Sequence, residues 1–287
     1  MTDLAAYILL GLLQGLTEFL PVSSSGHLVV LERLLRVDFG QNLLLEVVLH
    51  IGTLAAVIVV LRRELWRLVV DGLRGARLIL RGRGGQVRAE APCFGTALAV
   101  VVGTIPAALA GVAVKATVND AIKDPRLASI LIVVTGLLLC ASRLAPAGTH
   151  EDVSPGKGFL VGLAQAVALL PGISRSGTTI IAGYFVGLKR ETAARFSFLL
   201  AVPAIAGAGV VEVGLALLRH PGEAGALNTG DVVGLVCGAA AAGVVGWACL
   251  VLLFRTIRRG RLHWFAAYCI PAGLLFLVLS TVVGKAG

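Results

Sequence analysis

Two short polar stretches interrupt an otherwise apolar chain and carry most of the side chains that could do chemistry. The first is EFLPVSSSGH, from Glu18 to His27, and the second is PGISRSGTT, from Pro171 to Thr179. Proline, glycine and hydroxyl side chains cannot continue an apolar helix, and free backbone groups are costly in hydrocarbon unless protein or water satisfies them. We therefore expect both stretches to line a polar cavity, where they meet.

The second stretch has the composition of an anion site. Arg175 offers a permanently charged, planar donor that suits phosphate oxygens. Its insertion at mid-depth in a membrane costs roughly 2.5–3.5 kcal/mol, which favours a functional role. Small residues at the start of a helix also expose backbone amides that bind anions. The residues of this stretch that are predicted to bind phosphate are Ser174, Ser176, Gly177, Thr178 and Thr179.

The first stretch supplies candidates for acid, base and nucleophile. Glu18 lies four residues after Gln14, so both share one helix face. An ionisable group at this depth is a functional candidate, with a structural pair to Arg175 or a helix cap as the alternatives. Ser24 is a candidate nucleophile and His27 a candidate proton carrier, although a lone histidine more often only satisfies a hydrogen bond. The residues on this side that are predicted to bind phosphate are Gln14, Ser23, Ser25 and Gly26.

Composition places the chain in a membrane. Of its 287 residues 57% are hydrophobic and 14% charged, and the mean hydropathy is +0.92. These values lie well outside the range of soluble domains. The formal charge of +9 comes from arginines that cluster in loops, which argues against nucleic-acid binding. The five cysteines lack metal-site spacing and are interpreted as small buried hydrophobes.

The apolar pattern predicts an all-α polytopic membrane protein. Residues 4–36 form an apolar run that is interrupted at 21–27, and residues 158–187 form a second interrupted run. Each half of these runs is shorter than the ~20 residues that a spanning helix needs, so each run predicts a re-entrant helical hairpin. About six transmembrane helices complete the fold. They are expected near 43–61, 93–115, 127–145, 194–218, 230–254 and 262–284.

The order of the segments predicts an inverted repeat inside a single integral membrane domain, residues 1–287, with repeats at 1–146 and 157–287. One hairpin and three spans give each half an odd number of crossings, so the halves face opposite ways and the hairpin tips meet near the midplane. The alternative to a repeat is that small and apolar residues, which are frequent in this chain, match by chance in the alignment of the two halves. A shift of 151 positions aligns Gly11, Leu12, Gln14, Ser23, Ser25 and Gly26 with Gly162, Leu163, Gln165, Ser174, Ser176 and Gly177.

Arginine-rich connections mark the cytoplasmic side of a membrane protein. We interpret 62–90, with its glycine-rich centre, as a mobile cytoplasmic loop, and we place 146–157 and 255–261 on the same side. Both chain termini and the connections near 119–124 and 222–229 are then expected outside.

Other functions fit the same residues less well. The G-x-S-x-G pattern of serine esterases needs a glycine where Ser176 stands, and no strand pattern precedes it. The triplet SGH is similar to that of acid-phosphatase-like lipid phosphatases, a distant alternative because their second motif is not found. A transporter or flippase of an anionic lipid or small phosphorylated solute also fits an inverted repeat with an arginine-lined site. Hydrolysis is favoured because Ser24 and His27 beside Glu18 supply groups that transport does not need.

The two stretches together resemble the undecaprenyl-pyrophosphate phosphatase (bacitracin-resistance) family. The resemblance is carried by QGLTEFLPVSSSGH at 14–27, PGISRSGTT at 171–179 and FSFLLAVP at 196–203. It covers nearly the whole chain in length and in the order of segments, and the first two signatures are highly specific together. In that family the position of Gln14 holds glutamate or glutamine, so the ionised role falls to Glu18.

The resemblance implies a multi-pass enzyme of the bacterial cytoplasmic (inner) membrane. It would remove the terminal phosphate of undecaprenyl diphosphate, at an active site open to the outer face, and so recycle the lipid carrier for peptidoglycan synthesis. The positions that match residues implicated in the family's catalysis are Glu18, Ser24, His27, Ser174, Arg175 and Thr179.

The sequence allows two nucleophiles and does not fix the metal requirement or the oligomeric state. The nucleophile is either Ser24, activated by His27 or Glu18, or a water molecule. No tightly bound cofactor is expected, and Mg²⁺ or Ca²⁺ would be held mainly by substrate oxygens with Glu18 as the candidate protein ligand. The expected partners are a polyprenyl diphosphate lipid and the bilayer, and a homodimer is left open.

Overall fold

The structure is a computed structural model that describes residues 4–35, 43–117, 124–219 and 229–283. Within these residues the regular elements are helices, apart from one isolated bridge in the connections at one end of the molecule. Several of the helices are apolar and long enough to cross a membrane. The predicted all-α polytopic membrane fold is therefore confirmed.

Two pairs of short helices flank the predicted breaks. The first pair is α1 (Leu4–Phe19) and α2 (Ser24–Leu35), and the second is α7 (Pro155–Val167) and α8 (Arg175–Phe185). None of the four reaches the ~20 residues that a bilayer crossing needs. The chain is thus interrupted where its proline, glycine and serine residues predict.

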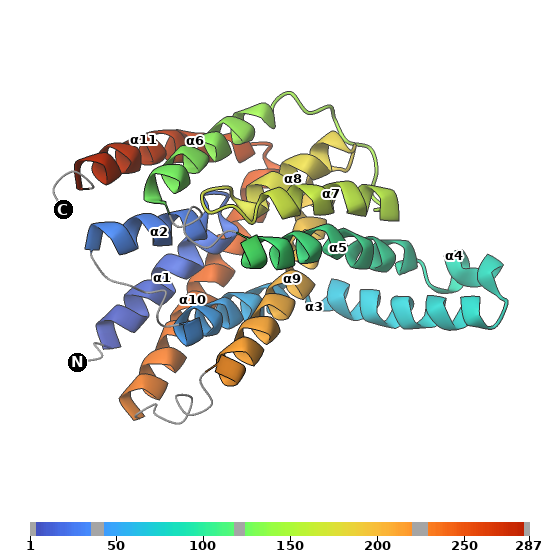
Figure 1. Cartoon of the computed structure of the whole chain (residues 1–287). Coiled ribbons are helices and arrows are strands. Elements are labelled where there is room, and N and C mark those ends of the chain that lie inside the picture. The colour runs from blue at the N-terminus through green and yellow to red at the C-terminus, as the bar shows by residue number, and fades with distance from the viewer. Residues whose placement is uncertain (1–3, 36–42, 118–123, 220–228, 284–287) are drawn as a thin grey trace.

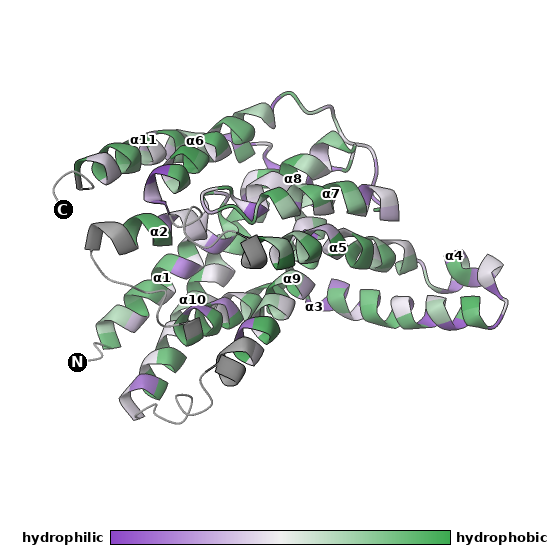
Figure 2. Cartoon of the chain, in the orientation of Figure 1, coloured by the Kyte–Doolittle hydropathy of each residue, from purple (hydrophilic) through white to green (hydrophobic). Residues whose placement is uncertain are grey.

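Longer helices surround these pairs. By length and composition, five of the described helices could cross a membrane, and the 17-residue α6 is apolar but shorter. Figure 2 shows that apolar residues dominate these helices. In Figure 1, α1 begins and α11 ends on the left, whereas the turn that follows α3 lies at the far right. The long helices are α3 (Leu43–Leu80), α5 (Phe94–Thr117), α6 (Pro125–Ala141), α9 (Arg190–Arg219), α10 (Thr229–Arg258) and α11 (Ala266–Val283), with short turns η2 (Gly84–Gln86), α4 (Val87–Glu90) and η5 (Leu262–Phe265).

The segment 62–90 corrects one expectation. Most of it is not a loop, because α3 continues as a helix to Leu80, with a local kink at Leu61 where φ is −101° and ψ is 17°. The Asp71 carboxylate accepts a hydrogen bond from the backbone amide of Cys93 (2.9 Å), which ties this part of α3 to the start of α5. Apolar residues recur between the arginines, and a helix places the two kinds on different faces.

Glycines bring two pairs of helices into backbone contact. A Cβ atom on Gly11 of α1 would overlap the carbonyl of Gly238 in α10, and one on Gly162 of α7 would overlap the carbonyl of Gly103 in α5. Such close approach favours helix association in lipid, where burial of apolar surface alone drives little. The two short helices that precede the breaks are therefore each held against a long helix.

An aromatic cluster supports the first break. Phe19 is buried and packs edge-on against Phe198 of α9, with ring centroids 5.7 Å apart, and Phe198 lies 5.8 Å from Phe254 of α10. Aromatic pairs of this kind add about 0.5–1.5 kcal/mol beyond the burial of their area. Because Phe19 directly follows Glu18, the cluster fixes the last turn of α1 and with it this carboxylate.

Candidate active site

The two breaks are in direct contact, as predicted. The Ser23 hydroxyl accepts hydrogen bonds from the backbone amides of Gly26 (3.3 Å) and Gly172 (3.1 Å). A Cβ atom on Gly26 would lie 2.8 Å from the Cα atom of Gly172, so the two backbones touch. Ser23 has a φ of 72°, a left-handed conformation that is uncommon for a residue other than glycine. Ser25, whose hydroxyl is 3.5 Å from that of Ser23, is exposed beside this contact.

Thr135 of α6 fastens the second break. Its buried hydroxyl donates to the carbonyl oxygen of Gly172 (2.8 Å) and accepts from the backbone amide of Ser174 (3.0 Å). Two backbone groups of the break are satisfied in this way, which matters because unpaired groups are costly in an apolar surrounding. Sequence reasoning missed Thr135, since one threonine in an apolar span does not indicate its partner.

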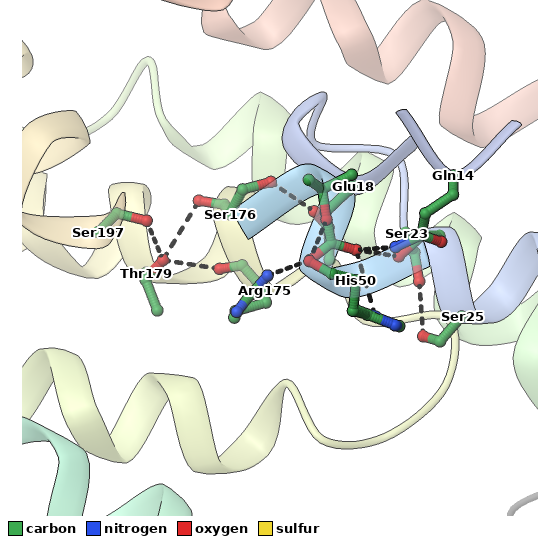
Figure 3. A network of polar contacts seen from close by, with 12 residues as sticks. Gln14, Glu18, Ser23, Ser25, His50, Arg175, Ser176, Thr179 and Ser197 are labelled. Carbon is green, nitrogen blue, oxygen red and sulfur yellow. Dashed lines mark hydrogen bonds and ion pairs between the residues drawn. The ribbon is translucent and has the colours of Figure 1, made fainter. Parts of the chain in front are cut away.

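Glu18 is the centre of the polar network drawn in Figure 3. Its Oε2 accepts hydrogen bonds from the Gln14 amide (3.0 Å) and from the Ser24 hydroxyl (2.8 Å). Its Oε1 forms an ion pair with the Arg175 guanidinium, which comes from the other break. A buried carboxylate requires such partners, because burial of an unpaired charge is costly. The network thus joins four of the predicted site residues.

His50 of α3 also belongs to this network, and sequence reasoning missed it. Its Nε2 lies 3.8 Å from Oε2 of Glu18, and its Nδ1 donates to the carbonyl oxygen of Glu46 (2.9 Å). A carbonyl oxygen only accepts, so Nδ1 carries a hydrogen and Nε2 is the nitrogen on the side of Glu18. The sequence did contain a signal for His50, because an ionisable residue inside an apolar span is a functional candidate by default.

Ser24 and His27 both lie at the start of α2 but have different neighbours. The His27 Nδ1 donates to the carbonyl oxygen of Ser23 (2.7 Å), and its Nε2 accepts from the Tyr268 hydroxyl of α11 (2.8 Å). The buried His27 ring is also stacked with Tyr268, at an angle of 9° between the planes. Within the described residues no hydrogen bond joins His27 to Ser24 or to Glu18. The structure therefore brings Ser24 into the network and leaves His27 beside it.

The start of α8 is the turn that the sequence predicts to bind an anion. Ser174 caps the helix, since its hydroxyl accepts from the backbone amide of Gly177 (3.2 Å), and it lies 3.2 Å from the Ser176 hydroxyl. The Arg175 side chain is 23% exposed, whereas that of Glu18 is 4% exposed. Arg175 can therefore reach a ligand from outside, while Glu18 is enclosed by protein.

Two neighbouring threonines of α8 have different surroundings. The Thr179 hydroxyl donates to the carbonyl oxygen of Arg175 (2.7 Å) and lies 2.6 Å from the Ser197 hydroxyl of α9, so it fixes α8 to α9. The Thr178 hydroxyl is buried without a partner in the described part of the chain, as is the side-chain amide of Gln165 in α7. An unpaired buried polar group costs about 1–3 kcal/mol, which a water molecule or ligand would remove.

The network combines a proton acceptor, a hydroxyl in contact with it and a cation that can neutralise phosphate charge. Among the described residues, no group of three or more His, Cys, Asp or Glu side chains is placed to hold a metal ion. Oxygen atoms of Glu18, Gln14 and Ser24 are of the kind that Mg²⁺ and Ca²⁺ prefer, but they include one carboxylate only. These residues therefore fit an ion that receives most of its ligands from a bound phosphate compound.

Known proteins resemble this chain over almost its whole length. The family described as bacitracin resistance protein BacA matches residues 7–275. The undecaprenyl-diphosphatase of Rhodopirellula baltica is 40% identical over 282 residues, which cover 98% of this chain and 99% of that relative. The undecaprenyl-diphosphatase of Desulfosudis oleivorans is 41% identical over 268 residues (93% and 94%), and that of Geobacter sulfurreducens is 39% identical over 274 residues (94% and 96%). The chain therefore belongs to the bacitracin resistance protein family BacA.

Proposed function

We propose that the protein hydrolyses undecaprenyl diphosphate to undecaprenyl phosphate and inorganic phosphate. Its relatives carry the name of this activity, and their sequences match this chain over nearly their full lengths. The observation that carries the proposal is the buried Glu18 carboxylate, held between the Ser24 hydroxyl and the Arg175 guanidinium inside an apolar bundle. The reaction returns the lipid carrier to peptidoglycan synthesis and thereby confers resistance to bacitracin.

Arg175 and the first turn of α8 bind the diphosphate. The guanidinium pairs with Glu18, and phosphate oxygens compete with that carboxylate for it. When the phosphates take the guanidinium, the Glu18 carboxylate loses the cation that holds its charge and can accept the Ser24 proton at Oε2. The positive end of the α8 dipole adds to this neutralisation, which is most of what phosphoryl transfer requires.

Glu18 is the general base in this proposal. The Ser24 hydroxyl already donates to it at 2.8 Å, whereas both ring nitrogens of His27 have other partners. In one route the Ser24 oxygen attacks the terminal phosphorus and its proton passes to Glu18. The bond from this phosphorus to the bridging oxygen breaks, and undecaprenyl phosphate leaves. Water then hydrolyses the phosphoserine. In the other route, Glu18 takes the proton of a water molecule that attacks directly. Both routes need the same base and the same phosphate clamp.

In this scheme a divalent ion would arrive with the substrate rather than reside in the protein. Mg²⁺ or Ca²⁺ would neutralise phosphate charge, and Glu18 is the protein group that would hold it. We propose no tightly bound cofactor, because one carboxylate gives a weak protein site on its own.

We also propose that residues 1–146 and 157–287 are inverted repeats. The shift of 151 positions relates Gly11 to Gly162, and both make the same kind of contact, the first with α10 and the second with α5. Each short helix thus packs on the second long helix of the other half. A two-fold axis between the halves would generate this exchange. A homodimer has no support in these contacts and stays a prediction.

We propose that the end of the molecule formed by the connections after α6, α8 and α10, called the arginine-rich end below, faces the cytoplasm, with the active site open to the outer face of the bacterial inner membrane. Three connections gather at this end: the backbone amides of Thr149 and His150 donate to the carbonyl oxygen of Gly187, and the Arg190 side chain contacts Gly260. The arginines of these connections favour the cytoplasmic side.

Cysteine labelling in intact cells tests this orientation. In a variant without native cysteines, Arg83→Cys and Arg259→Cys are expected to resist an impermeant thiol reagent added outside, whereas Asp124→Cys and Thr229→Cys are expected to react. All four positions are exposed, so each should be labelled once the cells are permeabilised. The predicted outer connections fall mostly outside the described residues, and Asp124 and Thr229 are their described edges. The opposite pattern would overturn the orientation.

Phosphate release tests the activity itself. Purified full-length protein in detergent is expected to release one inorganic phosphate for each undecaprenyl phosphate formed from undecaprenyl diphosphate. A transporter or flippase would bind the lipid and leave it intact, since transport needs no nucleophile or base. Detergent micelles without protein set the background, and release by the wild-type protein at that background level would contradict the proposal.

A further inference from the structure

A second polar cavity lies among the connections at the arginine-rich end. Its volume is about 170 Å³, room for roughly five water molecules at ~30 Å³ each. Tyr184, one of its residues, comes nine positions after Arg175 in α8, which is about 13 Å along a helix. The cavity is thus separate from the Glu18 network. It is lined by Ser142, Arg143, Tyr184, Arg190, Gly260, Leu262 and His263.

The lining is basic and has no carboxylate among its described residues. Arg143 follows α6, Arg190 begins α9 and His263 lies in η5. Within the described part of the chain, neither the Arg143 nor the Arg190 side chain forms an ion pair or donates a hydrogen bond. Two guanidinium groups with unused donors therefore face one small cavity, where they repel each other in the absence of an anion.

A neighbouring arginine-lined hollow shows the contrast. It has a volume of about 540 Å³ and includes Arg195 and Arg258. There Arg195 pairs with Glu64 and with Glu191, and Arg258 pairs with Glu191 (3.1 Å). Protein carboxylates thus already engage these two of its five lining arginines, whereas no carboxylate engages either arginine of the smaller cavity within the described residues.

Tyr184 adds an unpaired polar group to the smaller cavity, and Gly260 leaves room in it for Arg190. The Tyr184 side chain is 4% exposed, and its hydroxyl has no hydrogen-bond partner in the described structure. Such a group usually has a partner, because an unpaired buried hydroxyl costs about tenfold or more in an equilibrium constant. Gly260 has a φ of 69°, and a Cβ atom there would overlap the Arg190 guanidinium, so the missing side chain makes room for that cation.

Exposed apolar residues place the cavity at the level of the membrane interface. Leu144, Phe185 and Trp264 each follow a lining residue in sequence and are 80%, 52% and 57% exposed. The Arg261 guanidinium lies 4.3 Å from the Trp264 ring centroid. Tryptophan and arginine together are typical of the boundary between acyl chains and headgroups.

We propose that this cavity binds a phosphate group, in a place that the headgroup of an anionic phospholipid can reach. Unpaired arginines supply charge-assisted donors to the phosphate oxygens, and the Tyr184 hydroxyl supplies a neutral one. Basic pockets between helices on the cytoplasmic side commonly bind such headgroups. Inorganic phosphate has the same chemistry, so the test must separate the two sources. The inference does not depend on the proposed hydrolysis.

Ligand-dependent melting of the purified full-length protein tests the site. In a neutral detergent, soluble short-chain phosphatidylglycerol is expected to raise the melting temperature more than short-chain phosphatidylcholine does. Arg143→Gln and Arg190→Gln should each weaken the apparent affinity about tenfold, which corresponds to about 1.4 kcal/mol. Tyr184→Phe should weaken it fewfold to tenfold while leaving the protein without ligand as stable as before or more stable, because its hydroxyl has no protein partner.

Controls decide among the outcomes. Arg88→Gln removes an exposed arginine outside the cavity and should change nothing, while Arg175→Ala tests binding at the candidate active site. An effect of inorganic phosphate alone, lost in the Arg143 and Arg190 variants, supports the site and assigns it to the free ion. Stabilisation by either ligand that survives those variants, or that disappears only in Arg175→Ala, overturns the proposal.

Discussion

Glu18→Gln is expected to lower turnover of undecaprenyl diphosphate by about two orders of magnitude or more. Glutamine has the same size as glutamate, and its side-chain amide can still form hydrogen bonds with Gln14 and Ser24 after rearrangement. The amide cannot accept a proton at neutral pH, however. Arg175 loses its ion-pair partner, yet its side chain is 23% exposed and can remain hydrated. The measurement is phosphate release under saturating substrate, with the melting temperature recorded beside it.

Glu64→Gln is the matched control for the loss of an ion pair. Glu64 also pairs with an arginine, Arg195, but it lies on the arginine-rich part of α3, away from both breaks. If Glu18 were only a structural partner of Arg175, both changes would lower stability and leave turnover per folded protein near normal. Near-normal turnover of Glu18→Gln would therefore reduce Glu18 to a structural role.

The breaks and the helices around them could be predicted because local composition decides them. Proline, glycine and serine cannot continue an apolar helix, so the interruption between α1 and α2 follows from the letters themselves. The contact between the breaks, through Ser23 and Gly172, could be predicted only from the shift of 151 positions and from the topology that it implies. Periodicity alone would not have brought these two residues together.

Contacts between distant segments account for what the sequence did not show. The structure places His50 beside Glu18 and Tyr268 against His27, and each pair joins residues from different helices. An apolar helix turns one face to the site and another to lipid. The sequence does not show which face meets the site, because that depends on how neighbouring helices are rotated and shifted against each other. The loop prediction for 62–90 failed for a different reason, because arginines spaced along an amphipathic helix look like a basic loop in the sequence, whereas α3 continues to Leu80 in the structure.

Arg175→Lys is expected to retain the fold and part of the substrate affinity but to lose about 10²-fold or more in kcat. A guanidinium can offer two parallel donors to neighbouring phosphate oxygens, whereas an ammonium is a compact point charge that other groups must hold. Lysine can still pair with Glu18, so the charge balance of the buried network is kept. The loss should therefore come from misplaced phosphates and should exceed any change in melting temperature.

Arg195→Lys provides the comparison, because Arg195 pairs with Glu64 and Glu191, outside the Glu18 network. Its replacement should change stability slightly and leave kcat unaltered, as loss of partly exposed ion-pair geometry usually does. Arg175→Ala, assayed beside them, removes both the charge and the geometry and should lower substrate affinity as well. A lysine variant at position 175 within a fewfold of the wild-type kcat would show that Arg175 acts through its charge alone. The diphosphate would then have to be aligned by the start of α8 and the hydroxyl groups around it.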